Sequence, residues 1–307
     1  MAVTLSSPDK VLWPEVGLTK RDLFDYVREA SDRLLPQVAD RPLSFKRFPR
    51  GVDAKGFFQK DLPDHAPEAI GRWRQWAESA DREVAYALVD DVEGLEWLAQ
   101  QNVVELHPAL FRVDRPDRGD QLVFDVDPGP DPIPPARVAR WIREVLVELG
   151  LDPVAKTSGG RGLHVIVPIE RRYGQDLLRP LTLAIARMVV DRHPDVLTVE
   201  MRKDERHGRT LVDWSRSGAS TLIAAWSPRA HPQATVATPL DWDEVTDELD
   251  PTAFTLRTVL DRPDPWEGAW QVQRLERAAT AVVDAGFDLL DASPRGRTGS
   301  YLGGTAR

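Results

Sequence analysis

The chain has 307 residues, a net charge of −9, no cysteine and six histidines. Its length allows one large domain or two smaller ones, and its apolar content of 42% excludes a disordered chain. The composition also excludes disulfides, thiolate chemistry and a zinc site with Cys/His spacing. No apolar run is long enough to cross a membrane, and residues 1–15 lack the basic flank and apolar core of a secretory signal, so we expect a cytoplasmic protein.

Periodic patterns predict helices and strands along most of the chain. Residues 16–37 have an amphipathic helical pattern, with Thr19 as N-cap and Asp22 three residues later. Residues 134–150 predict the clearest helix, which starts at a proline pair and ends at Gly150. A β-hairpin is expected from strands at 153–157 and 163–169 joined by the turn 158–162. Further elements are expected at 83–90 (strand), 92–106 (helix into strand), 121–128 (strand), 179–193 (helix), 196–201 and 209–215 (strands).

The order of these elements predicts the fold class. From about residue 120 it runs strand, helix, strand, strand, helix, strand, strand, which is typical of an α+β fold with a ferredoxin-like sheet and helices on one face. We expect one domain over 1–290, in which an N-terminal α/β module (about 1–118) packs on a sheet-bearing module (about 119–265), followed by C-terminal helices (about 266–290). Residues 291–307 are rich in Gly, Ser and Arg, and we expect a disordered tail.

Two carboxylates, Asp125 and Asp127, lie near the end of the expected strand "QLVFDVDP". Residues two apart in a strand point to the same face, so the two side chains project side by side and repel each other. A hard divalent cation such as Mg²⁺ or Mn²⁺ would remove that conflict, because it prefers oxygen ligands. The alternative is a strand end with two solvated acids before a Pro-Gly turn. The pair alone leaves both interpretations open.

A third carboxylate, Asp213, lies in the strand-like run "GRTLVDWSRSG". It stands between Val212 and Trp214, where an acid is unusual in a core strand unless something neutralises it. An edge strand or a salt bridge to a neighbouring arginine would explain it without any function. Three carboxylates from two strands would instead suit a two-metal site for in-line phosphoryl transfer.

The turn "SGGRG", residues 158–162, is rich in small residues, so its backbone amides can approach an anion closely. Arg161 adds a donor that can bind phosphate through two nitrogens. His164 opens the next strand. The alternative is an ordinary hairpin turn followed by a strand histidine with a local partner.

Basic residues gather in two stretches in spite of the negative net charge. Residues 41–60 hold six basic side chains against one acid, and a second basic stretch covers 201–216. In the first, Phe57 and Phe58 stand between Lys55 and Lys60. Aromatic side chains interleaved with basic ones suit single-stranded or frayed nucleic acid. The alternative is that the two phenylalanines belong to the core and the lysines form a solvated rim.

Taken together, these motifs resemble a known family. The segments "DKVLWPEVGLTKRDLFDY", "RPLSFKRFPRGVDAKGFFQK", "GLEWLAQQNVVELH", "LVFDVDPG", "TSGGRGLHVIVP", "VDWSRSG" and "WSPRAHP" occur in the order found in the polymerase domain of bacterial ligase D, the primase-polymerase of non-homologous end joining. That domain belongs to the archaeo-eukaryotic primase superfamily. The resemblance covers roughly residues 3–260 and implies a two-layer primase-polymerase fold.

The resemblance implies a role for each matching residue. The metal ligands, for two Mn²⁺ or Mg²⁺ ions, would be Asp125, Asp127 and Asp213. The incoming nucleoside triphosphate would contact Ser158, Arg161, His164 and Arg229, with His107 near its sugar, where ribonucleotides are usually preferred. The 5′-phosphate at a DNA break or gap would be held by Lys10 and Lys20. The template strand would meet Lys46, Arg47, Phe57 and Phe58.

Two positions depart from the family pattern. Many relatives have lysine where Arg161 stands, and many have a lysine where this chain has Thr221, so one phosphate or primer contact is in question. The fused ligase and nuclease modules of the relatives are not in this sequence. We therefore expect a polymerase that works in the cytoplasm, on the nucleoid, with a separate DNA ligase and possible help from Ku, and without a membrane partner.

The sequence thus predicts a DNA-dependent nucleotidyltransferase that fills gaps and extends ends at DNA breaks, in non-homologous end joining or excision repair. Two alternatives remain. "LVFDVDPG" also resembles the nucleophile motif of haloacid-dehalogenase-type phosphatases, although those chains carry it near the N-terminus and with Thr or Val where this chain has Gly129. The other alternative is a DNA-end-binding module without activity, against which the presence of all three acids argues.

Overall fold

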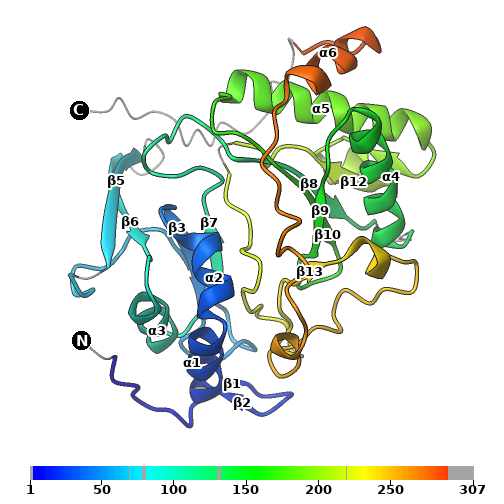
Figure 1. Cartoon of the computed structure of the whole chain (residues 1–307). Helices are drawn as coiled ribbons and strands as arrows, with labels where there is room; N and C mark the ends of the chain where they lie inside the picture. The colour runs from blue at the N-terminus through cyan, green and yellow to red at the C-terminus, as the bar shows by residue number, and fades with distance from the viewer. Residues whose placement is uncertain (1–2, 69, 78–80, 130–132, 219, 290–307) are drawn as a thin grey trace.

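Two β-sheets, each with its own helices, form the body of the computed structural model (Figure 1). The structure describes residues 3–68, 70–77, 81–129, 133–218 and 220–289. The expected disordered tail, 291–307, lies outside this range. No helix in the described parts of the chain is long and apolar enough to span a membrane.

The larger sheet has six strands in the order β11-β12-β8-β10-β9-β13, and we call it the catalytic sheet. Only β11 runs parallel to its neighbour, and the expected hairpin is the antiparallel pair β9–β10. The strands are β8 (Gln121–Asp127), β9 (Val154–Thr157), β10 (Leu163–Pro168), β11 (Leu197–Thr198), β12 (Thr210–Asp213) and β13 (Pro239–Leu240). The order confirms the mixed fold with one main sheet that the sequence predicted, although β11 is shorter than expected.

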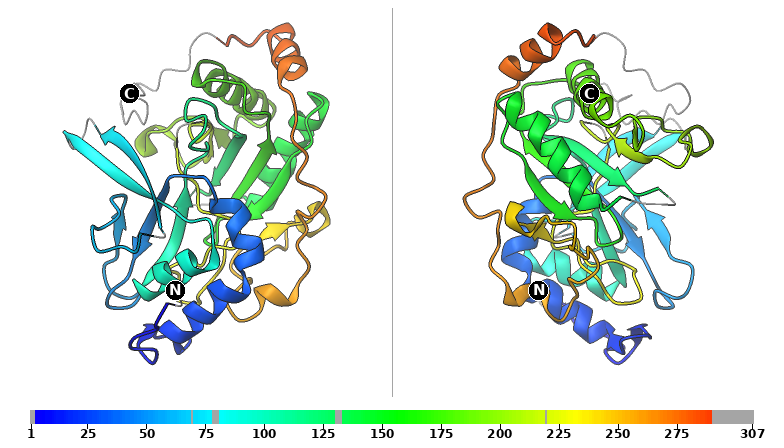
Figure 2. Two further views of the ribbon diagram at one scale, coloured as in Figure 1. Left: turned by 60° about the vertical axis from the view of Figure 1, so that its left-hand side comes forward. Right: turned by 90° about the vertical axis from the view of Figure 1, so that its right-hand side faces the viewer.

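Helices α4 (Pro135–Glu148) and α5 (Gln175–Arg192) cover one face of the catalytic sheet (Figure 2). Strand β8 alternates, so that Phe124 and Val126 pack against these helices while Val123 points to the other face. Helix α4 ends as expected, with Gly150 in the left-handed region at φ +77°. A last helix, α6 (Glu276–Asp284), follows a segment of mostly irregular structure that contains the short turns η3 (Trp242–Glu244) and η4 (Val259–Asp261).

The N-terminal part of the chain forms the second sheet, in the order β4-β3-β6-β5 with β7 beside β3. The capping box of Thr19 and Asp22 begins α1, as the sequence predicted. The single helix expected over 16–37 is instead two helices that meet at Ala30. The elements are β1 (Val11–Trp13), β2 (Leu18–Thr19), α1 (Lys20–Glu29), α2 (Ser31–Val38), β3 (Leu43–Arg47), β4 (Phe57–Gln59), β5 (Gly71–Ala77), β6 (Arg82–Leu88), α3 (Val92–Gln100) and β7 (Val103–Pro108).

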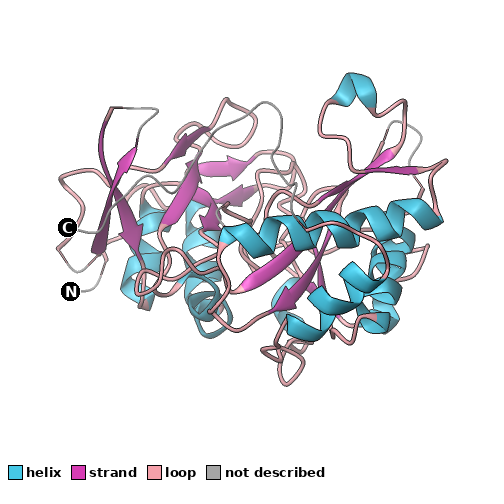
Figure 3. Cartoon of the chain, turned by 90° about the horizontal axis from the view of Figure 1, so that it is seen from above, coloured by secondary structure: helices cyan, strands magenta, loops and turns pink. Residues whose placement is uncertain are grey.

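The two sheets share a hydrophobic core. Val123 and Ile166 from the catalytic sheet belong to the same buried cluster as Phe45 and Leu106 from the N-terminal sheet. Figure 3 shows the two groups of strands from above. The helices of the catalytic sheet pack against the face that carries Phe124 and Val126, and the opposite face belongs to the shared core. The face of β8 that carries the odd-numbered residues, and hence Asp125, therefore faces the N-terminal part of the chain.

Candidate active site

Four polar residues form one row across the catalytic sheet. Asp125 of β8 lies directly opposite Asp213 of β12 on one side and His164 of β10 on the other. Lys156 of β9 continues the row beyond His164. Residues that lie directly opposite in a sheet point to the same face, and Asp127 follows Asp125 on that face two residues later. Strand pairing thus brings the three carboxylates predicted from the sequence together.

The carboxylates are partly neutralised by neighbouring side chains. Asp125 Oδ1 lies 3.3 Å from His164 Nε2, and Arg216 Nε lies 3.2 Å from Asp213 Oδ2 and 3.7 Å from Asp125 Oδ2. The amide and hydroxyl of Ser215 donate to Asp213 Oδ1 at 2.8 and 2.6 Å. The salt bridge expected as one explanation of Asp213 is therefore present. The edge-strand explanation is wrong, because β11 and β8 flank β12.

The surroundings shift the pKa values of Asp125 and Asp127 in opposite directions. Burial opposes ionisation of Asp125, but His164, Arg216 and Lys156 hold its pKa below the usual value. Burial raises the pKa of Asp127, and the charges of Asp125 and Asp213 raise it further. Two neighbouring like charges therefore disfavour the ionised form of Asp127.

This set of donors fits hard divalent cations, which prefer carboxylate oxygens. In the present conformation, no three His, Asp or Glu side chains of the described residues are gathered closely enough to form a metal-binding group. The guanidinium of Arg216 lies against two of the carboxylates instead. A cation bound by Asp125 and Asp213 would have to replace those contacts.

The row opens into a cavity of about 330 Å³ between the two sheets. The lining residues are Phe58, His107, Asp125, Asp127, Ser158, His164, Arg216, Thr221, Leu222, Ile223 and Arg229. The cavity thus combines two of the predicted metal ligands, Asp125 and Asp127, with most of the predicted nucleotide contacts, while the buried Asp213 lies behind its wall. Thr221, one of the two positions noted as departing from the expected pattern, is among the lining residues.

The turn 158–162 closes one side of this cavity. Ser158 Oγ accepts hydrogen bonds from the backbone amides of Gly160 at 3.2 Å and Gly162 at 3.3 Å. Gly159 has φ +68°, and a Cβ atom built there would lie 2.4 Å from Cγ of Arg229. A side chain at position 159 would therefore displace Arg229. Glycine is needed here both for the left-handed conformation and for this close approach.

A buried carboxylate that the sequence reasoning missed, Glu105, organises the opposite wall. Glu105 Oε2 lies 3.1 Å from His107 Nε2, and Glu105 Oε1 lies 3.7 Å from Arg229 Nε and accepts from the amide of Ala230 at 3.1 Å. Burial would raise its pKa, but its bond to His107 and the charge of Arg229 lower that pKa to about 2. Glu105 and His107 stand two apart in β7, and this Glu-x-His spacing was the signal that could have found it.

Lys156 and Arg216 were also missed. Lys156 is fully buried, and its Nζ donates to the backbone oxygen of Thr157 at 3.3 Å. Burial, and then the charge of Arg229, hold its pKa well below the usual value. Its place in the row follows from strand register, which the local sequence does not show, whereas Arg216 could have been found three residues after Asp213.

The residues predicted to meet the template lie on β3 and β4, at the edge of the N-terminal sheet. Lys46 lies opposite Phe58 and Arg47 opposite Phe57, with each cation 5.7 Å from the centre of the facing ring. Phe57 is 46% exposed and Phe58 58% exposed. The alternative that these phenylalanines belong to the core is therefore wrong.

Asp213 does not line the cavity, and neither do three other predicted site residues, Lys10, Lys20 and Arg161. The amide of Lys20 donates to the Lys10 carbonyl at 2.8 Å, so the two lysines are neighbours at the β1–β2 pair. Lys20 is buried and its Nζ donates to the Ser6 carbonyl at 2.9 Å, while Lys10 Nζ donates to the Pro49 carbonyl. Arg161 is exposed on the turn and does not line the cavity. Their roles stay predictions.

A mixed α/β chain with three clustered carboxylates beside a glycine-rich turn is typical of enzymes that act on phosphates. The family model described as "LigD, primase-polymerase domain" matches residues 19–270. The chain therefore belongs to the LigD primase-polymerase domain family. This confirms the resemblance found in the sequence, and the phosphatase alternative has no support.

Relatives and solved structures agree with this assignment. The chain is 38% identical over 258 residues to the multifunctional non-homologous end joining DNA repair protein LigD of Mycobacterium tuberculosis (strain H37Rv), and 30% identical over 261 residues to the bifunctional non-homologous end joining protein LigD of Bacillus subtilis (strain 168). These matches cover 80% and 84% of the chain but only 34% and 42% of the relatives. The structure of the polymerase domain of M. tuberculosis ligase D in complex with DNA superposes with a TM-score of 0.79 at 36% identity, covering 85% of this chain and 93% of that one.

Proposed function

We propose that the chain is a DNA-dependent nucleotidyltransferase that fills gaps and extends ends at DNA breaks, with a preference for ribonucleotides. The observation that carries the proposal is that Asp125 and His164 line the same cavity as the phosphate-type donors Ser158 and Arg229, with Asp213 paired to Asp125 on the neighbouring strand. The solved relative in complex with DNA supports the substrate class. The relatives named for non-homologous end joining support a role in that pathway, and excision repair is the alternative role for the same activity.

In the proposed reaction, a primer 3′-hydroxyl attacks the α-phosphate of a nucleoside triphosphate, and pyrophosphate leaves. Asp125, Asp127 and Asp213 would hold two Mn²⁺ or Mg²⁺ ions, which when bound supply Lewis-acid stabilisation of the attacking and leaving oxygens. Asp125, held by His164, is fixed in orientation before substrate arrives. Ser158 Oγ accepts from two amides of its own turn, so its hydroxyl proton would donate to the triphosphate.

The walls of the cavity would bind and orient the nucleotide. Glu105 holds both His107 and Arg229, so one buried carboxylate positions the residue proposed for the sugar and a residue proposed for the triphosphate. Arg161 would reach the triphosphate from the exposed side of the turn. Arg229, at 27% side-chain exposure, keeps a guanidinium edge available to a phosphate.

DNA would be bound on the N-terminal part of the chain. Exposed phenylalanines beside cations offer stacking surfaces and phosphate contacts for the template, at Lys46, Arg47, Phe57 and Phe58. Lys10 and Lys20 would hold a 5′-phosphate.

We also propose that residues 1–290 act as one domain with modules at about 1–118, 119–265 and 266–290. Sealing of the extended end would need a separate DNA ligase, with Ku as a further partner.

The proposal is tested by primer extension on a gapped duplex with the Asp125→Ala and Asp213→Ala variants. Both should lose extension and keep their affinity for gapped DNA, because the acids act on the reacting phosphate rather than on the duplex. Asp195→Ala, which removes an exposed carboxylate outside the cavity, is the matched control and should extend normally. Extension by Asp125→Ala or Asp213→Ala near the wild-type rate would refute the assignment.

A further inference from the structure

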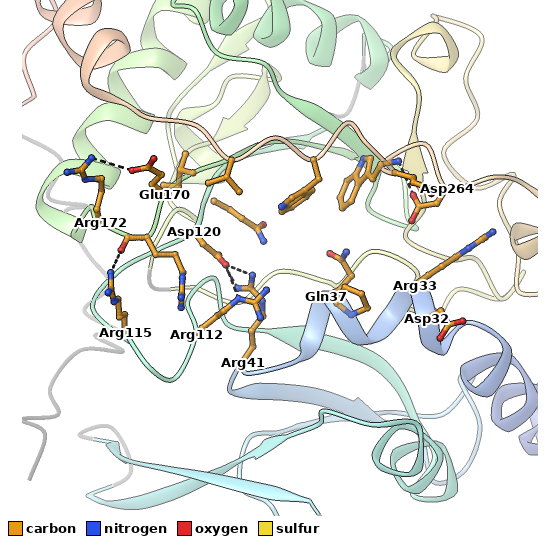
Figure 4. Close-up of a pocket in the computed structure, with 18 of the residues that line it drawn as sticks. Asp32, Arg33, Gln37, Arg41, Arg112, Arg115, Asp120, Glu170, Arg172 and Asp264 are labelled. Atoms are coloured by element: carbon orange, nitrogen blue, oxygen red, sulfur yellow. Dashed lines mark hydrogen bonds and ion pairs between the residues drawn. The ribbon is translucent and has the colours of Figure 1, made fainter.

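A second, larger cavity of about 1350 Å³ lies between α2 and the C-terminal segment 263–274 (Figure 4). It opens at the Gln121 end of β8, whereas the candidate active site lies at the Asp127 end, about 20 Å away along the strand. None of the residues that line the active-site cavity lines this one. We call it the arginine cleft.

One end of the arginine cleft is strongly basic. The lining there holds two carboxylates, Asp120 and Glu170, and six arginines: Arg41, Arg112, Arg115, Arg171, Arg172 and Arg274. Three carboxylates outside the lining also pair with them, Asp40 with Arg112, Asp114 with Arg171 and Glu276 with Arg172. Asp120 is shared by Arg41, which is buried, and by Arg112 at 3.7 Å. Glu170 is shared by Arg172 at 3.3 Å and Arg274 at 2.9 Å. Each lining carboxylate thus serves two arginines.

Two of these arginines keep donors for a ligand. Arg115 is exposed, its Nη1 donates to the Arg171 carbonyl at 3.3 Å, and no carboxylate of the described residues is within ion-pairing distance of it. Arg112 Nη1 donates to the Ala39 carbonyl at 2.9 Å, and its two carboxylates lie at 3.6 and 3.7 Å, beyond good hydrogen-bonding distance, so Nη2 stays available. Burial lowers the pKa of Arg112, and the charge of Arg41 lowers it further, so an anion placed here would relieve repulsion between guanidinium groups.

Aromatic side chains continue from this basic end. The rings of Trp266 and Trp270 lie 4.9 Å apart, and Trp266 is fixed by its indole nitrogen, which donates to the Ala155 carbonyl at 3.0 Å. Trp270 is only partly buried and lines the cleft. Beyond the tryptophans, the far end carries Asp32 and Asp264 beside a single arginine, Arg33, so it is less favourable for phosphates than the basic end. A bound polyanion should therefore extend only along the basic and aromatic half of the cleft.

We propose that the arginine cleft is a second nucleic-acid site, which binds a short single-stranded segment by its phosphates at Arg112 and Arg115 and by stacking of a base on Trp270. Arginines beside an aromatic face are the combination that holds single strands without reading their sequence. The inference rests on the proposed function only for the choice of nucleic acid over an acidic protein segment. The site lies apart from the template residues of β3 and β4, so a strand could occupy both.

The first test measures binding of a labelled oligothymidylate of about ten nucleotides over a range of salt concentrations. Arg115→Glu should weaken binding about tenfold and reduce the slope of log affinity against log salt by about 1, because one phosphate contact is lost. Arg187→Glu is the matched control, since Arg187 is exposed on α5 on the helical face of the catalytic sheet. Equal affinity and slope for the two variants would overturn the proposal.

The second test locates the bound strand. Trp270→Ala should weaken binding about tenfold and Trp270→Phe much less, because Phe keeps an aromatic face and loss of one stacked base has about this effect. An oligonucleotide with a photoreactive base should crosslink within 263–274. Crosslinks confined to β3 and β4, or competition by polyglutamate as strong as that by oligothymidylate, would overturn the proposal. Gap extension by Arg115→Glu at saturating substrate should equal that of the wild type, which separates failure of this inference from failure of the proposed function.

Discussion

Asp127→Asn should stabilise the metal-free protein, although it removes a proposed metal ligand. The side chain of Asp127 follows that of Asp125 on the same face, about 7 Å along the strand. At an effective dielectric constant of about 20, two charges at that distance repel by about 2 kcal/mol. Because the Asp127 side chain is in contact with solvent, screening reduces this to about 1 kcal/mol. The unfolding temperature of the metal-free variant should then be about 2–4 °C higher.

The pH dependence of that difference follows from the raised pKa of Asp127. The folded state binds this proton more tightly than the unfolded state, so the wild type loses stability as pH rises from the usual Asp value through the folded pKa. The gain of the Asp127→Asn variant should therefore be full at neutral pH and vanish at acidic pH, where the wild-type carboxyl is protonated.

With Mn²⁺ bound, the wild type should be more stable than Asp127→Asn, the reverse of the order expected without metal. At a concentration about 100 times its dissociation constant, a ligand of the folded state alone stabilises it by about 2.7 kcal/mol. The wild type should show this increase in thermal unfolding experiments with MnCl₂ and lose it with EDTA, while Asp127→Asn should gain far less. Asp195→Asn serves as the control and should behave as the wild type. A variant that is no more stable without metal, and that responds to Mn²⁺ as the wild type does, would refute this reasoning.

Three further predictions concern the walls of the site and the DNA end. Glu105→Gln should raise the KM for the nucleotide about tenfold. As pH falls from about 4.5 to about 2, the wild type should lose roughly 3 kcal/mol of unfolding free energy through protonation of Glu105, and the variant should not show this loss. Gly159→Ala should destabilise the protein by about 1–3 kcal/mol in denaturant titrations, because φ at this position is +68°. It should also raise the KM for the nucleotide, because the new Cβ atom would displace Arg229. A normal KM would show that Arg229 does not bind nucleotide. Lys10→Ala should erase any preference for 5′-phosphorylated gaps in binding assays at low salt, and equal affinity of the wild type for both kinds of gap would remove that role.

The sequence was sufficient for features that depend on local spacing. The capping box at Thr19, the glycine that ends α4 and the shared face of Asp125 and Asp127 each follow from a few neighbouring residues. The family resemblance then assigned roles that spacing alone left open. Most of the residues assigned to the nucleotide line one cavity, and their roles stay predictions.

Features that depend on the pairing of distant strands could not be predicted. The row from Asp213 to Lys156 exists because β8 lies between β12 and β10, an order that no local pattern encodes. Glu105 reaches the site from the other sheet. The exposure of Phe57 and Phe58 follows from the position of β4 at a sheet edge, and a hydrophobic pair in the sequence looks the same at an edge as in a core.

The central claim is that this chain adds nucleotides to a primer at a DNA gap. The most direct measurement is extension on a 5′-phosphorylated gapped duplex, with ribonucleotides and deoxynucleotides compared in Mn²⁺ and in Mg²⁺. We expect template-directed addition that requires one of these ions and is faster with ribonucleotides. Tight binding to the gapped duplex with no addition under any of these conditions would contradict the account and would identify the chain as a DNA-end-binding module instead.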